Sequence, residues 1–140
     1  MIDVTDEVEA RIDALAGSPD PVAAVAELLR LGEEVLCRWV DAAGETPTDD
    51  RREGFRLLAL HRQGARGQPS FNACRETCRE LAYHYNLVTL MPEHPETAHR
   101  LRMAASVTKH LHLFVTGKMR DAGLGEFCCA SRPLRQAADR

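Results

Sequence analysis

The chain of 140 residues is long enough for one domain that buries a core without disulfides or a structural metal. Hydrophobic residues make up 44% and charged residues 28%, which excludes a globally disordered chain. The formal net charge is −3, and the arginines are interleaved with acids, with no basic run longer than the pair Arg51 and Arg52. Because nucleic-acid-binding proteins usually carry a basic stripe, we expect no nucleic-acid partner.

The first 15 residues are acidic and amphipathic and lack the basic start and apolar stretch of a secretory signal. No segment approaches the ~18 apolar residues of a membrane-spanning helix. Five cysteines form no regular framework, which favours reduced thiols over disulfides. We therefore expect a cytoplasmic protein with no membrane partner. The strong preference for arginine over lysine is typical of a GC-rich bacterial genome.

Apolar side chains at helical spacing predict a short N-terminal helix over residues 4–15, which stops at Gly17. Asp20 is expected to cap a second helix that starts at Pro21, because proline lacks the amide hydrogen that has no partner at that position. Gly44 ends this helix. Thr48 is expected to cap a third helix that continues to the neighbourhood of residue 64.

Ser70 is expected to cap a fourth helix, which Pro92 and Pro95 separate from the fifth, since proline cannot continue a helix from the preceding residue. The fifth helix is predicted over residues 95–122 and is the longest. A flexible tail follows from about residue 126 and carries the vicinal pair Cys128 and Cys129.

No segment alternates as a strand would, and no internal repeat is present. The predicted fold class is therefore all-α: one domain over residues 1–140, an antiparallel bundle of four longer helices plus the short N-terminal helix. The helical periodicity predicts that five side chains are buried: Trp39, Leu58, Leu81, Leu111 and Val115.

Two cysteines, Cys74 and Cys78, lie one turn apart on the apolar face of the predicted fourth helix. In an antiparallel helical hairpin the numbers of paired residues have a constant sum, so His112 and His61 are both expected close to the level of the two thiols. Two thiolates and two imidazoles suit zinc, and they also suit copper(I). Ordinary core packing is the alternative, because free cysteine is commonly buried as a small hydrophobe.

A second apolar strip on the predicted fifth helix consists of Met103, Val107 and Phe114. An exposed strip of this kind would favour aggregation unless a partner covers it. It predicts a homodimer that buries Val107 and Phe114 between the two copies.

The sequence contains no Gly-rich phosphate loop and no nucleophile elbow, and it lacks the two Glu-x-x-His motifs of the di-iron type, so it does not favour an enzyme. The leading hypothesis is a small binding, regulatory or accessory protein whose partner is a protein or a small ligand. One alternative is a zinc or copper protein that uses His61, Cys74, Cys78 and His112. Another is an accessory enzyme with a cofactor in the bundle core.

Overall fold

A computed structural model describes residues 4–122, which form five α-helices and one 3₁₀-helix and contain no strand. The elements are α1 Val4–Ala16, α2 Pro21–Ala42, α3 Arg56–Ala65, the 3₁₀-helix η1 Pro69–Cys74, α4 Arg75–Leu90 and α5 Thr97–Asp121. The all-α prediction is confirmed. The predicted tail from residue 126, with Cys128 and Cys129, lies outside the described residues.

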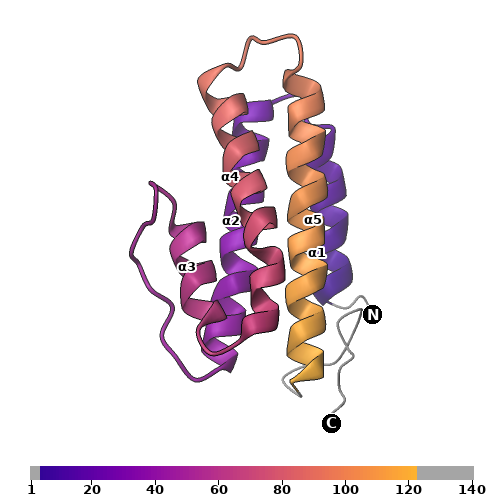
Figure 1. Ribbon diagram of the computed structural model, residues 1–140. Helices are drawn as coiled ribbons and strands as arrows, with labels where there is room; N and C mark the ends of the chain where they lie inside the picture. Colours follow the sequence, from indigo (N-terminus) through magenta and orange to yellow (C-terminus); the bar gives the residue numbers. More distant parts are fainter. Residues whose placement is uncertain (1–3, 123–140) are drawn as a thin grey trace.

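The four helices α1, α2, α4 and α5 lie alongside one another, and α5 contacts the other three (Figure 1). The short α3 packs against α2 and α4. It has 10 residues and α1 has 13, so the third helix, rather than the N-terminal one, is the shortest. The long connection between α2 and α3 runs outside the main group of helices (Figure 1).

The second helix begins as predicted. Asp20 is its N-cap, and the carboxylate Oδ1 accepts a hydrogen bond from the Ala23 backbone N–H at 3.3 Å. Pro21 is the first helical residue, a position at which a backbone N–H would have no acceptor within the helix, so the lack of an N–H in proline costs nothing there. This local chemistry fixes the start of α2 without help from the rest of the fold.

The third helix starts at Arg56, and the prediction that Thr48 caps it is wrong. The Thr48 hydroxyl instead accepts a hydrogen bond from the Asp50 backbone N–H, two residues away, at 3.0 Å. Glu53 and Gly54 then adopt φ angles of 56° and 87°, which no right-handed helix contains. A local turn therefore takes the place of the first part of the predicted helix.

The fourth predicted helix is divided, because residues from Pro69 to Cys74 form the tighter η1 and α4 follows only from Arg75. Ser70 lies inside η1 and does not cap α4. The Phe71 backbone N–H donates to the carbonyl oxygen of Gln68 at 2.9 Å, and the Phe71 side chain is fully buried. The 3₁₀ segment thus brings this aromatic ring into the core.

All five side chains predicted to be buried are buried: Trp39, Leu58, Leu81, Leu111 and Val115. Val107 is buried as well, with 9% of its surface exposed, and the half-buried Phe114 packs against the core. The expectation that these two residues form an exposed strip is therefore wrong, because α5 buries a wide face against three helices. The large apolar side chains that are exposed are Val22, Tyr83, Leu90, Met91, Met103 and Leu113.

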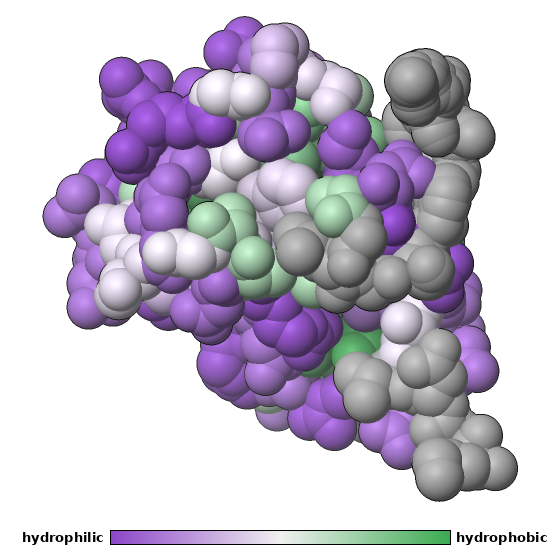
Figure 2. Space-filling model, turned by 90° about the horizontal axis from the view of Figure 1, so that it is seen from below, coloured by the Kyte–Doolittle hydropathy of each residue, from purple (hydrophilic) through white to green (hydrophobic). Residues whose placement is uncertain are grey.

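None of the helices within residues 4–122 combines the length and apolar character needed to cross a membrane. The end of the molecule shown in Figure 2 carries mainly hydrophilic side chains, with smaller hydrophobic areas between them.

Three aromatic rings from separate elements form a stack in the core. The Phe71 ring lies between Trp39 and His61, with ring centroids 4.9 Å and 5.3 Å apart and interplanar angles of 13° and 17°. The Trp39 indole Nε1 donates to the carbonyl oxygen of Gly64 at 2.9 Å. The stack and this hydrogen bond together hold α3 against α2 and η1.

We predict that Gly64→Ala destabilises the protein, although alanine is the better helix former by about 1 kcal/mol. An added Cβ would lie 2.7 Å from Trp39 Cδ1 and 3.0 Å from Trp39 Nε1. The indole is held by its stack and hydrogen bond, so overpacking should lower the free energy of unfolding by about 1–3 kcal/mol. Urea denaturation of the two proteins measures this change.

Gly17→Ala is the control for this measurement, because nothing lies within 4 Å of its added Cβ. A Gly64→Ala variant as stable as the wild type would show that Trp39 can move without loss.

Candidate functional site

All four residues of the predicted metal site, His61, Cys74, Cys78 and His112, are buried, as the apolar periodicity indicated. His61 and the two thiols lie together. His61 Nε2 is 3.0 Å from the carbonyl oxygen of Phe71, and the Cys74 thiol donates to the same oxygen at 3.3 Å. Both side chains are therefore positioned by the backbone of η1.

His112 lies in a different environment, where the charge of Arg38 in α2 and the backbone of Thr5 in α1 act on its imidazole. Within residues 4–122, no three histidine, cysteine or acidic side chains are arranged so that they could hold one metal ion. The zinc or copper site stays a prediction for metal analysis of the purified protein, and we build no function on it.

The two thiols differ strongly in acidity. A hydrogen bond from Cys78 lowers the pKa of Cys74 to about 6, against the opposing effect of burial and with further help from His61. The same hydrogen bond, together with burial, raises the pKa of Cys78 well above its ordinary value. Burial lowers the pKa of His61, but its hydrogen bond and charge interaction with Cys74 outweigh burial and raise it. The pKa of Cys74 is thus lowered and that of His61 raised by their interaction with each other.

We predict that the Cys74 thiolate titrates with a midpoint near pH 6. The measurement is the pH dependence of thiolate ultraviolet absorbance, taken as the difference between wild type and Cys74→Ser. His61→Gln should raise the midpoint, because it removes the cation that stabilises the thiolate. A wild-type midpoint at or above the ordinary value of 9.0 would contradict the arrangement.

We predict that His112 makes the protein less stable at acidic pH. Burial and the charge of Arg38 lower the pKa of His112 from 6.5 to about 4. Between pH 6.5 and pH 4 this histidine is protonated in the unfolded chain but stays neutral in the folded protein. The free energy of unfolding should therefore fall by about 3 kcal/mol as the pH drops through this range. Denaturant unfolding between pH 7 and pH 4 should show a shallower decline for His112→Leu.

His110→Gln is the control for the pH dependence, because His110 is exposed on the same helix. An unchanged decline in His112→Leu would mean that other groups cause the acid sensitivity.

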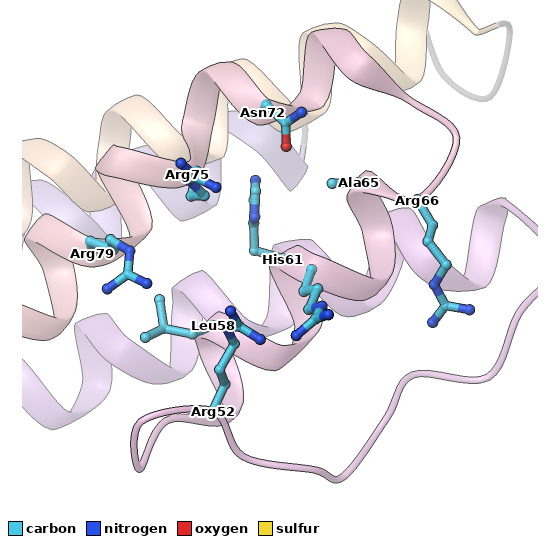
Figure 3. Close-up of a pocket in the computed structure, with 9 residues that line it drawn as sticks. Arg52, Leu58, His61, Ala65, Arg66, Asn72, Arg75 and Arg79 are labelled. Carbon is cyan, nitrogen blue, oxygen red and sulfur yellow. The ribbon is translucent and has the colours of Figure 1, made fainter.

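An open cleft of about 330 Å³ lies on the outer side of His61, between α3 and the η1–α4 segment. Its wall contains five arginines together with two other polar side chains and two apolar ones: Arg52, Arg62, Arg66, Arg75, Arg79, His61, Asn72, Leu58 and Ala65. Figure 3 shows His61 extending from α3 toward Asn72 and Arg75 on the opposite wall. The cleft is therefore strongly cationic, although the whole chain is not.

The cleft arginines differ in whether an acid neutralises them. Arg79 forms two hydrogen bonds with the carboxylate of Glu53, at 2.7 Å and 3.0 Å. In the part of the chain that the structure describes, no carboxylate pairs with the other four arginines of the cleft. Four guanidinium groups are thus available to an external anion.

The cleft was not predicted from the sequence, because the arginines that line it form no continuous basic run. A partial signal was present, since Arg75 and Arg79 are spaced by four residues and lie on one face of α4. Arg62 and Arg66 have the same spacing, but Arg66 follows the end of α3 in an extended conformation. That the two pairs face each other follows only from how α3 packs against α4.

No protein-family model matches the chain, and comparisons with curated proteins and with solved structures also found no significant match. The cleft is therefore the feature of the described residues on which a function can be proposed.

Proposed function

We propose that this protein binds a small anion, with phosphate or carboxylate groups, in the arginine cleft. The observation that carries the proposal is that five arginines line one hollow, four of them without an ion pair to an acid among residues 4–122. Arginine is suited to this role because its planar donors match the oxygens of carboxylates and phosphates in pairs.

Electrostatic repulsion supports the proposal. Arginine remains charged at all accessible pH values, so neighbouring guanidinium groups repel one another and weaken the fold unless an anion neutralises them. Elsewhere on the surface some cations are neutralised, as in the pairs Arg11–Glu27 and Lys109–Asp13. In the cleft four arginines without an ion pair line a single hollow, which anion binding would explain.

The size of the hollow favours a small ligand over an extended polymer. A volume of about 330 Å³ is at the lower end of the range of small-molecule sites. The walls are also well supported, since His61 contacts the Phe71 ring and the backbone of η1 in the core.

We further propose that this binding protein is bacterial and lies in the cytoplasm, and that its helices form an antiparallel bundle. A reducing cytoplasm would keep the Cys74 and Cys78 thiols free, as their hydrogen bonding requires. Homodimerisation stays a prediction. The exposed Tyr83, Leu90 and Met91 offer apolar contact area for it in place of Val107 and Phe114.

We predict saturable binding of pyrophosphate, a probe with several negative charges, measured by isothermal titration calorimetry at low salt. Arg62→Ala and Arg75→Ala should each weaken the affinity by about ten-fold or more, because each loses charge-assisted hydrogen bonds. The affinity should also fall as salt is added, as expected for charged partners in an open cleft.

Arg102→Ala is the matched control, because Arg102 is exposed on α5 and does not line the cleft. Its affinity should equal that of the wild type. Absence of saturable binding, or equal losses in all three variants, would reject the proposed function.

A further inference from the structure

The loop that borders the cleft contains an unusual two-residue turn. Arg52 and Phe55 exchange both backbone hydrogen bonds, each at 3.0 Å, around Glu53 and Gly54. Both central residues have positive φ, of 56° and 87°. Such turns strongly favour asparagine or glycine at the first central position, because a larger side chain adopts this conformation at a cost. Glu53 is therefore a costly choice for the turn itself.

The contacts of the Glu53 carboxylate explain why a glutamate stands at this position of the turn. Both of its oxygens accept hydrogen bonds from Arg79 of the cleft wall, in the paired geometry that arginine also forms with external carboxylates and phosphates. The contact spans 26 residues of sequence and brings the turn to α4. The two side chains are 52% and 40% exposed, so the ion pair is accessible to competing ions.

We propose that Glu53 is an internal competitor that occupies Arg79 in place of one anionic group of the ligand. This inference rests on the proposed function and narrows the ligand class to molecules with two or more linked anionic groups. One group binds the unpaired arginines near His61, and the second displaces the Glu53 carboxylate from Arg79. A ligand with a single anionic group binds without reaching Arg79.

An exposed ion pair is weak enough for this exchange. Surface pairs of arginine and carboxylate contribute little, since solvent screens them and both side chains lose freedom. A linked second anionic group has a high effective concentration once the first group is bound, so it can replace Glu53. The turn also supplies Arg52 to the cleft wall, and release of Glu53 leaves Arg52 beside the ligand.

The test compares pyrophosphate with inorganic phosphate by calorimetry in wild type, Glu53→Gln and Asp49→Asn. Asp49 is the matched control, because it lies in the same loop and pairs with Arg56, which does not line the cleft. Glu53→Gln should bind pyrophosphate about two- to five-fold more tightly than wild type and phosphate with unchanged affinity. Asp49→Asn should leave both affinities unchanged.

A double-mutant cycle with Arg79→Ala completes the test. The gain from Glu53→Gln should vanish when Arg79 is absent, because the competition requires that guanidinium. Circular dichroism of each variant confirms that the helices persist.

Three outcomes would overturn the inference while leaving anion binding intact. In the first, Glu53→Gln leaves the affinity for pyrophosphate unchanged, and in the second it weakens that affinity. In the third, Glu53→Gln raises the affinity for pyrophosphate and for phosphate equally, and Asp49→Asn does the same. The last would reflect only the removal of a negative charge at long range. If no variant binds either probe, the proposed function fails together with this inference.

Discussion

The enclosure of Phe71 between Trp39 and His61 is the contact on which the rest of the structure depends. The fully buried ring joins η1 to α2 and α3, and a tilted contact with Phe114 at 5.9 Å extends the cluster to α5. Aromatic pairs in such geometry contribute beyond the area they bury. Without this cluster the short α3 would lose its main anchor, since isolated helices of 10 residues are marginal in water.

The same cluster connects the core to the cleft through His61. One face of the imidazole lies against Phe71, its Nε2 is held by the Phe71 carbonyl oxygen, and the ring also forms part of the cleft wall. The Cys74 thiol, whose pKa is lowered by hydrogen bonds with Cys78 and His61, donates to the same carbonyl oxygen. Charge at the buried thiol and charge in the cleft are therefore coupled through one side chain.

Charged side chains and ion pairs are unevenly distributed over the surface. Among residues 4–122, Arg11, Arg30, Arg56 and Lys109 form ion pairs outside the cleft, whereas the ion pair formed by the cleft arginines is that of Arg79 with Glu53. This carboxylate comes from a turn whose positive φ angles glutamate does not favour, and both of its oxygens accept hydrogen bonds from Arg79. The proposed anion binding and the proposed competition by Glu53 both rest on this charge distribution.

The sequence by itself determined the features that depend on neighbours along the chain. Helical periodicity identified the all-α class and the burial of His61, Cys74 and Cys78, and the Asp20–Pro21 pair gave the start of α2. The start of α3 was missed because Glu53 and Gly54 form a turn closed by two backbone hydrogen bonds between Arg52 and Phe55, and glutamate is not a residue that usually indicates such a turn.

Only the tertiary structure decided which side chains meet. The constant-sum rule gives the height of a residue along a helical hairpin but leaves open the direction in which its side chain points around the helix axis. His112 was therefore expected near the thiols, yet it faces α1 and α2, because α5 buries residues against three helices at once. The arginine cleft depends on the same missing information, since each i, i+4 pair is visible in the sequence but their convergence arises from the packing of α3 on α4.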